Sequence, residues 1–167
     1  MVAESCCSSS APPTSPSAAG TCPSCGERGR SVSLLTVQAL VALSLRELGQ
    51  PPYWFCARAN CAVVYFAAEA SPITCDQLRE RVFQKEPDPG VLVCYCFRYS
   101  RSAVQQADSI TRAAILADVV AGTQQGQCAC EIRNPQGSCC LGNLRRLLRE
   151  QADSFAECEE DGWGTMN

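Results

Sequence analysis

Cysteine is abundant in this sequence and histidine is absent, and these two facts restrict its chemistry more than any other feature. Fourteen of the 167 residues are cysteine. A metal site in such a chain has mostly thiolate ligands, which suit zinc, iron–sulfur clusters and copper(I). The absence of histidine excludes histidine general bases, Rieske-type ligation and Cys2His2 zinc fingers.

Dense cysteine also occurs in short secreted proteins, where it forms a disulfide framework. Two observations favour metal binding over disulfides here. The first residues lack the basic start and the apolar core of a signal peptide, which predicts a cytoplasmic location. Cysteines one residue apart, as at Cys94 and Cys96, or adjacent, as at Cys139 and Cys140, are poor disulfide partners for each other but good metal ligands.

The overall composition predicts a folded protein that does not bind large anionic partners through its net charge. Apolar residues make up 46% of the chain and the formal net charge is −3, which disfavours binding to nucleic acid or anionic membranes. The longest apolar run, 34–48, is interrupted by polar residues and is interpreted as a core helix capped by Ser33, so no membrane span is expected. No nucleophile is paired with a base, so we expect no catalytic residues and a binding or electron-transfer protein rather than an enzyme.

Composition divides the chain into four segments. Residues 1–20 are rich in Ser, Ala and Pro and are interpreted as a disordered tail, and 156–167 as an acidic tail. A Pro- and Gly-containing loop at 87–90 predicts a boundary between two subdomains. We therefore expect an α+β protein, with a zinc-ribbon-like β subdomain at 21–88 and a small helical cluster-binding subdomain at 91–155.

The first candidate site consists of two cysteine pairs in the β subdomain. Cys22 and Cys25 form a C-x2-C turn of the zinc-knuckle kind. Cys56 and Cys61 lie between two runs of aromatic and β-branched residues, which predict a hairpin with this pair at its tip. A third strand is predicted within 67–90. Four thiolates in two such turns satisfy tetrahedral zinc with no open position, as in a structural site.

The second candidate site joins Cys94 and Cys96 to the cysteines between residues 128 and 140. Two short helices are predicted between these groups, at about 102–107 and 111–120. Closely spaced thiols separated in this way are a means of folding a chain around a polynuclear metal centre, and the leading candidate is an iron–sulfur cluster.

A third helix is predicted to begin near Cys139 and Cys140, where its positive end would favour an anionic cluster. Spacing alone leaves open whether Cys128 or Cys130 binds, and whether Cys139 or Cys140 does. The aromatic residues Trp54, Phe55, Tyr65 and Phe66 are interpreted as core packing rather than a base-stacking surface, because no basic patch accompanies them.

Four motifs in order resemble the N-terminal domain of the CopZ-type copper chaperones, a family of iron–sulfur cluster-binding metallochaperones. The resemblance spans residues 21–150, and its C-x-C and helical part also resembles bacterioferritin-associated ferredoxin. The motifs are Cys22-Pro-x-Cys25, Phe55-Cys56-x4-Cys61-x-Val63-Val64-Tyr65-Phe66, Val93-Cys94-Tyr95-Cys96 and Asn134-Pro135-x-Gly137-x-Cys139-Cys140.

This resemblance implies one mononuclear zinc ion and one [2Fe-2S] cluster in the same domain. It implies one-electron transfer or metal reduction in copper homeostasis, with copper or another soft metal as cargo and a separate chaperone or transporter as partner. The implied zinc ligands are Cys22, Cys25, Cys56 and Cys61. The implied cluster ligands are Cys94, Cys96, Cys130 and Cys140.

Two features depart from the family pattern. The residue after the second hairpin cysteine, usually acidic in relatives, is Ala62. Relatives continue into a heavy-metal-associated domain with its own C-x2-C pair, and no such pair follows Cys140 in this sequence.

Two other functions stay open on the sequence. The first is a thiol-based protein that binds and transfers copper(I) or mercury(II) without a redox role, using spare cysteines such as Cys6, Cys7, Cys128 and Cys139. The second is a zinc-ribbon interaction module in which both cysteine groups bind zinc. Cys75 and Cys158 have no assigned role.

Overall fold

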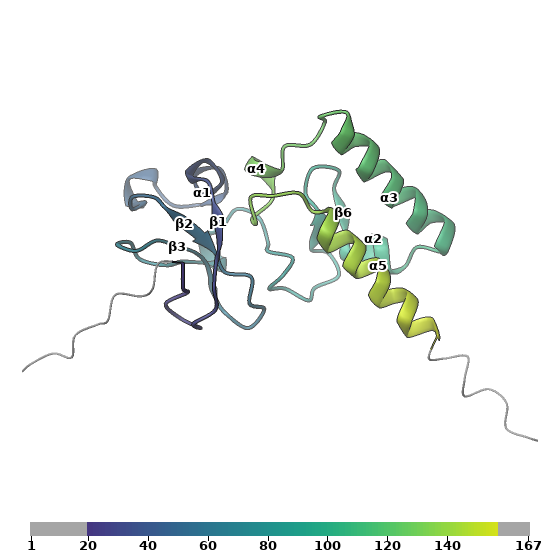
Figure 1. Cartoon of the computed structure of the whole chain (residues 1–167), viewed down its shortest axis with the longest axis horizontal. Coiled ribbons are helices and arrows are strands. Elements are labelled where there is room, and N and C mark those ends of the chain that lie inside the picture. Colours follow the sequence, from purple (N-terminus) through teal and green to yellow (C-terminus); the bar gives the residue numbers. More distant parts are fainter. Residues whose placement is uncertain (1–19, 157–167) are drawn as a thin grey trace, which may run out of the picture.

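The computed structural model describes residues 20–156 of the chain, with side chains to residue 151. The predictions for the two tails and for Cys6, Cys7 and Cys158 lie outside these residues. Within this range a sheet-containing half lies beside a helical half (Figure 1). This combination of helices with antiparallel sheet confirms the α+β class.

The N-terminal half is a four-stranded antiparallel sheet in the order β1-β2-β3-β4. The predicted hairpin is present as β2 and β3, with Trp54 opposite Phe66 and Phe55 opposite Tyr65. The strand β1 at its edge has no counterpart among the predicted elements. The elements are β1 (Arg30–Val32), α1 (Leu34–Leu40), the 3-10 helix η1 (Leu45–Glu47), β2 (Tyr53–Phe55), β3 (Val63–Phe66), β4 (Ile73–Thr74) and the 3-10 helix η2 (Cys75–Gln77).

The predicted helix 34–48 is too long. Ser33 caps it as expected, because its hydroxyl accepts a hydrogen bond from the Thr36 backbone N–H. The helix ends at Leu40 because Val41 is extended and pairs as an isolated bridge with Leu78. Backbone bonds on both sides of this bridge replace the helical ones that would continue α1.

The third strand predicted within 67–90 is reduced to the two residues of β4. A 3-10 turn, η2, follows at once, and Gln77 accepts from the Thr74 backbone N–H to close a capping box. Between η2 and residue 90, the chain makes only the isolated bridge at Leu78.

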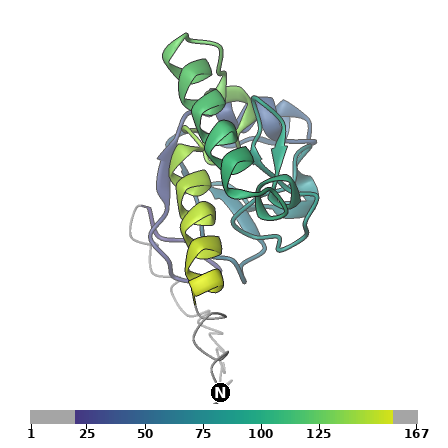
Figure 2. The same cartoon turned by 90° about the vertical axis from the view of Figure 1, so that its right-hand side faces the viewer.

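The C-terminal half contains the three predicted helices and a short hairpin. The helix predicted at about 111–120 extends from Ser109 to Gln124, and Gly122 within it is buried against Phe97 rather than placed at a cap. Helices α3 and α5 lie side by side on the outer face (Figure 2). The elements are β5 (Leu92–Cys94), β6 (Tyr99–Ser100), α2 (Arg101–Gln105), α3 (Ser109–Gln124), α4 (Cys130–Arg133) and α5 (Leu141–Ala156).

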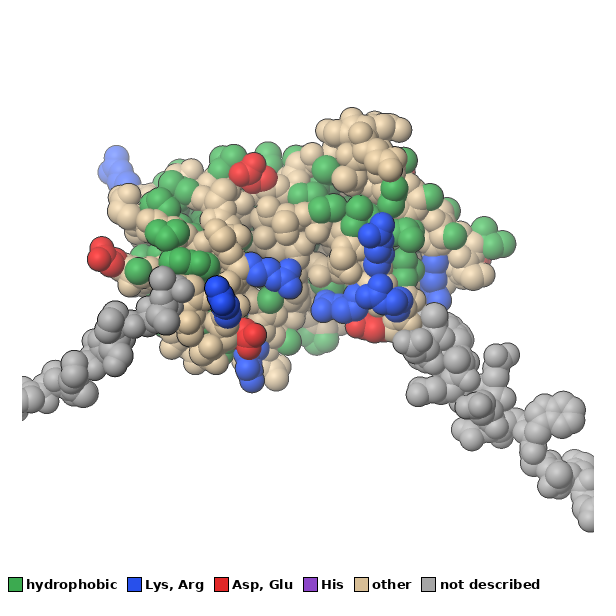
Figure 3. Space-filling model, viewed as in Figure 1, with side chains coloured by type: hydrophobic (Ala, Val, Ile, Leu, Met, Phe, Trp, Pro, Cys, Tyr) green, Lys and Arg blue, Asp and Glu red, His purple; other side chains and the backbone are tan. Residues whose placement is uncertain are grey.

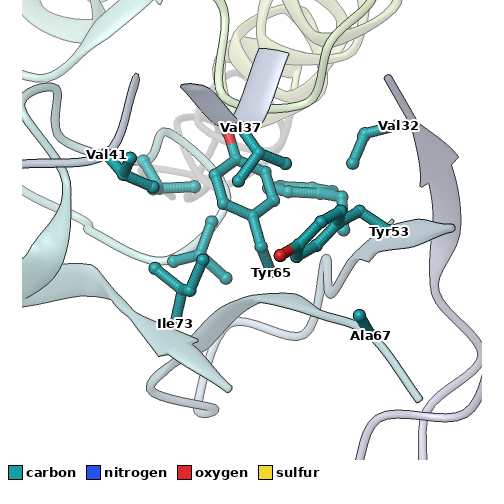
Figure 4. Packing of buried hydrophobic residues seen from close by; sticks show 10 residues of the cluster. Val32, Val37, Val41, Tyr53, Tyr65, Ala67 and Ile73 are labelled. Carbon is teal, nitrogen blue, oxygen red and sulfur yellow. The ribbon is translucent and has the colours of Figure 1, made fainter. Parts of the chain in front are cut away.

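Each half has its own hydrophobic core, and the two cores meet at adjacent residues. Figure 4 shows the Tyr65 ring in the middle of the first core, among Val37, Tyr53 and Ile73. Val82 belongs to this first core, whereas Phe83 belongs to the second, which also contains the buried side chains of β5, α3 and α5. No helix within residues 20–156 is long and apolar enough to cross a membrane.

Buried hydrogen bonds and helix packing join the two halves. The Tyr65 hydroxyl donates to the Pro135 carbonyl at 2.7 Å. The Tyr95 hydroxyl donates to the Arg81 carbonyl at 2.7 Å and accepts from the Phe83 backbone N–H at 3.0 Å. Helices α1 and α4 pack together where the halves meet (Figure 1). The cysteines of the two candidate sites are therefore placed by one continuous folded body.

Candidate metal centres

The first cysteine group is compact. The sulfur atoms of Cys22 and Cys61 lie 3.9 Å apart, those of Cys25 and Cys56 lie 3.6 Å apart, and all four lie within 4.8 Å of one another. Tetrahedral zinc with Zn–S bonds of about 2.3 Å requires sulfur separations of about 3.8 Å. The four thiols thus have the spacing of a tetrahedral metal site.

Two turns place these sulfurs. In the first turn Gly26, at φ +72°, returns the chain so that its N–H bonds to the Cys22 carbonyl. In the second turn Cys56 directly follows β2, and its backbone N–H donates a hydrogen bond to the Val64 carbonyl. The Lys85 ammonium donates to the Cys61 carbonyl at 2.8 Å. The sequence pattern did not predict this contact, because Lys85 lies 24 residues after Cys61 in the chain.

The surroundings of this group favour different protonation states for its thiols. Burial raises the pKa of Cys56 to about 12. Burial also opposes ionisation of Cys61, but a hydrogen bond from the Val63 backbone and bonds from neighbouring side chains outweigh it and lower the pKa to about 7. Trp54 and Phe66 pack beside the group as a stacked pair with ring centroids 5.8 Å apart. These contacts confirm the interpretation of the aromatic residues as packing.

The second cysteine group consists of two pairs. The sulfur atoms of Cys96 and Cys130 lie 3.7 Å apart, and the Ala129 backbone N–H donates to the Cys96 sulfur at 3.3 Å. Cys94 and Cys140 form the other pair: a side-chain hydrogen bond with Cys140 lowers the pKa of Cys94 to about 7, and the same bond raises the pKa of Cys140. The Cys94 and Cys140 pair is buried, whereas Cys96 and Cys130 are half-buried.

The elements of the C-terminal half place these four cysteines as two pairs. Cys94 ends β5, and Cys96 lies in the turn to β6, where Arg98 takes a left-handed conformation with φ +64°. Cys130 begins α4, which no sequence signal predicted. Cys140 directly precedes α5, and its carbonyl accepts from the Leu144 backbone N–H.

A side-chain network holds the loop between α4 and α5. The Asn134 side chain donates to the Ser138 carbonyl at 2.7 Å, and the Gln136 side chain donates to the Cys139 carbonyl at 2.9 Å. Both side chains are almost fully buried. Gly137 adopts φ +66° with Thr36 of α1 close against it, so the loop is also fitted to the N-terminal half. These contacts orient the backbone that carries Cys139 and Cys140.

The remaining described cysteines lie outside both groups. Cys139 is exposed, whereas Cys128 and Cys75 are half-buried. The eleven cysteines within residues 20–151 are all free thiols. Within the same residues, three or more potential metal ligands come within 4.8 Å of one another only in the group formed by Cys22, Cys25, Cys56 and Cys61.

Comparisons with known proteins give a consistent result for this architecture. A family model described as a zinc-binding domain, zf_CopZ, matches residues 19–79, which contain the whole first cysteine group. The crystal structure of the N-terminal domain of CopZ from Archaeoglobus fulgidus superposes with a TM-score of 0.60 at 32% sequence identity. The match covers 76% of this chain and 96% of that domain.

The chain belongs to the CopZ copper chaperone family. It also aligns with the full-length copper chaperone CopZ of Archaeoglobus fulgidus, at 32% identity over 126 residues, or 75% of this chain. The aligned region spans 60% of the length of that relative. The CopZ match confirms the family predicted from the cysteine motifs and establishes a zinc-binding domain in the N-terminal half.

Proposed function

We propose that this chain is a metallochaperone of copper homeostasis that holds zinc in its first cysteine group and a [2Fe-2S] cluster in its second. The observation that carries the proposal is the contrast between the two groups. One is a compact set of four sulfurs, and the other is two separate pairs.

The proposed zinc ligands are Cys22, Cys25, Cys56 and Cys61. Their sulfur separations of 3.6 and 3.9 Å suit tetrahedral zinc, and the family model for a zinc-binding domain spans all four. Four thiolates leave no open coordination position, so zinc would have a structural role here. It would hold the β2–β3 hairpin tip against the first turn of the domain.

The proposed cluster ligands are Cys94, Cys96, Cys130 and Cys140. Each iron of a [2Fe-2S] cluster takes two cysteine thiolates, so two pairs of neighbouring sulfurs are the arrangement that such a cluster needs. Cys96 with Cys130 and Cys94 with Cys140 would supply those pairs. Cysteine spacing left open whether Cys139 or Cys140 is the fourth ligand. Cys140 is buried and Cys139 is exposed, which favours Cys140 as the ligand.

A bound cluster would supply one-electron redox chemistry. The chain would tune that chemistry through the Ala129 N–H, which already donates to the Cys96 sulfur. Cys94 packs in the second core with Val93 and Leu144, which would limit the access of water to this ligand. The half-buried Cys96 and Cys130 would form the side nearest to solvent, where an electron partner can approach.

Copper is the proposed cargo because the named relative is a copper chaperone and because thiolates prefer soft metals. A separate metal chaperone or transporter would receive the metal. The cytoplasm is the proposed location, because a reducing compartment keeps these thiols free for metal.

The test is an absorption spectrum of anaerobically purified protein, combined with iron, sulfide and zinc analysis of the same sample. We expect visible charge-transfer bands, with about two irons and one zinc per chain. A colourless protein that still holds only zinc after attempted cluster reconstitution would contradict the redox function while leaving the zinc site in place.

A second candidate function is thiol-based transfer of copper(I) or mercury(II) without redox chemistry. The exposed thiol of Cys139, next to the second cysteine group, favours it. Titration of copper(I) into cluster-loaded protein separates the two functions. Tight, stoichiometric binding that disappears in a Cys128→Ser, Cys139→Ser double variant would favour transfer, and absence of such binding would favour the redox protein.

A further inference from the structure

A basic pocket lies where the two halves meet, outside both cysteine groups. It has a volume of about 330 Å³. The buried side chains of Leu40 and Tyr95 contribute apolar wall, and Ile132 of α4 lines it with a side chain that is itself partly exposed. The charged side chains that line the pocket are those of Arg79, Arg98, Arg133 and Glu80.

The three guanidinium groups are poorly neutralised. Arg98 contacts Glu80 at 3.9 Å, and both side chains are more than 40% exposed, so this ion pair contributes little. Within residues 20–151 the side chains of Arg79 and Arg133 form neither an ion pair nor a hydrogen bond. Three positive charges therefore face one negative charge around a single cavity.

Charge is unevenly distributed along the chain. All fourteen basic residues lie within 20–151, whereas only eleven of the seventeen acidic residues do. The described body is therefore positive although the whole chain is negative. Figure 3 shows groups of Lys and Arg side chains on the face in view.

Backbone structure holds each arginine at the pocket. The Arg79 N–H bonds to the Leu40 carbonyl of α1 at 2.8 Å, and the Arg133 N–H bonds to the Ala129 carbonyl at 3.0 Å. Arg98 is the only residue other than glycine with a positive φ in the described part of the chain, a conformation that is unfavourable for a residue with a Cβ. Three separate segments thus converge on one cavity.

We propose that this pocket binds a small polyanion, with its carboxylate or phosphate groups against Arg79, Arg98 and Arg133. The planar guanidinium fork matches both kinds of group in a bidentate way. The volume of about 330 Å³ falls at the small end of the range for small-molecule sites.

The location of the pocket suggests a role for this anion binding in metal reduction, and that role rests on the proposed function. Tyr95 directly precedes Cys96, and Ile132 lies two residues after Cys130, so two lining residues of the pocket are close in the chain to the half-buried cysteine pair. A polycarboxylate complex of copper(II) bound there would lie near the cluster side that faces solvent. One electron would leave the reduced cluster and convert copper(II) to copper(I), with no change in protonation required.

Binding can be tested without the cluster. Citrate and inorganic pyrophosphate are titrated by calorimetry into the zinc-loaded full chain at low salt, with zinc content as the check on folding. The triple variant R79Q/R98Q/R133Q is compared with R145Q/R146Q/R149Q, which removes the same charge from exposed positions of α5. We expect the pocket variant to bind about tenfold or more weakly and the α5 variant to retain affinity within about twofold.

The two anions distinguish the source of the ligand chemistry. Tighter binding of citrate would support a carboxylate ligand, and tighter binding of pyrophosphate a phosphate ligand. Equal weakening in both triple variants would show only general charge attraction and would overturn the site. Absence of binding to the unmodified chain would overturn it as well.

The redox consequence is tested separately by stopped-flow oxidation of the reduced protein. Copper(II) citrate and the cation hexaammineruthenium(III) serve as oxidants. We expect the pocket variant to slow the citrate reaction about fivefold or more and to leave the ruthenium reaction unchanged, because only the anion uses the arginines. Equal rates with copper(II) citrate in both proteins would overturn the use of the pocket in reduction. A protein with no reducible chromophore would instead remove the proposed function while the calorimetric result stands.

Discussion

The hydroxyl of Tyr65, in the sheet of the zinc-binding half, donates a 2.7 Å hydrogen bond to the carbonyl oxygen of Pro135 in the helical half. Both residues are buried and they are 70 positions apart in the chain. Pro135 belongs to the loop that leads to Cys139 and Cys140. A side chain from one core therefore fixes the backbone that approaches the proposed cluster ligands.

Replacement of Tyr65 by phenylalanine tests this link. The variant keeps the ring in the core but leaves the Pro135 carbonyl without its partner, which costs about 1–3 kcal/mol of unfolding free energy. Chemical denaturation followed by circular dichroism measures the loss. Tyr99→Phe is the matched control, because its hydroxyl donates to Asp118 at an exposed position, and we expect a change below about 0.5 kcal/mol. Equal losses in the two variants would contradict a special role for the Tyr65 bond.

Replacement of Cys61 by serine tests the first metal centre. The variant loses one of four sulfurs in a compact site, so zinc content should fall from about one per chain toward zero and the N-terminal half should unfold at lower denaturant. Cys75→Ser is the control, because Cys75 lies in the same half but outside the group. Zinc content is measured by mass spectrometry after gel filtration. Full zinc occupancy in the Cys61 variant would rule out the four-cysteine site.

Single serine variants across the second group test the choice of cluster ligands. Cys96→Ser and Cys130→Ser should each abolish the visible chromophore while zinc is retained, because their sulfurs form one of the two close pairs. Cys128→Ser and Cys139→Ser should keep the chromophore. Absorption and iron analysis of anaerobic samples give the readout. Loss of colour in Cys128→Ser together with its retention in Cys130→Ser would reverse the assignment.

Replacement of Gly122 by alanine tests how α3 supports the second group. A Cβ at this position would overlap the ring of Phe97, the residue after Cys96, so the ring must move. We expect a loss of about 1–3 kcal/mol in unfolding free energy and weaker retention of the chromophore.

Gly142→Ala provides the control for that variant. Gly142 is also helical, but nothing lies within 4 Å of the position its Cβ would take. We expect that variant to gain about 0.5–1 kcal/mol from helix propensity alone. A similar gain in the Gly122 variant would show that the contact with Phe97 imposes no constraint.

Local cysteine spacing predicted the grouping of the first centre well, because each of its pairs lies in one short turn. The hairpin that carries Cys56 and Cys61 was also predictable from its alternating aromatic and β-branched residues. The second centre was harder. Cys130 approaches Cys96 because it begins α4, a helix of only four residues. The N-cap of α4 is Ala129, which makes no side-chain capping hydrogen bond, so the start of this helix has no sequence signal.

Long-range pairing explains why some elements differ from the sequence-based prediction. The apolar run 34–48 has a helical pattern, but Val41 pairs with Leu78, a partner that cannot be identified locally. The edge strand β1 has only three residues, two of them polar and exposed, and so lacks a strand signal. The basic pocket was not predictable either, because Arg79, Arg98 and Arg133 are scattered in the sequence and meet only in the folded chain.

Val82 and Phe83 are neighbours in the chain but pack into different cores. A protease cut or a truncation in the Pro- and Gly-containing loop at 87–90 would therefore leave Phe83 on the wrong fragment, with its apolar ring exposed. The same cut would separate Tyr95 from the Arg81 carbonyl and Tyr65 from Pro135. Neither half can therefore be excised without exposing part of its core. To keep only one of the two cysteine groups, a designer must redesign the face that the other half covers.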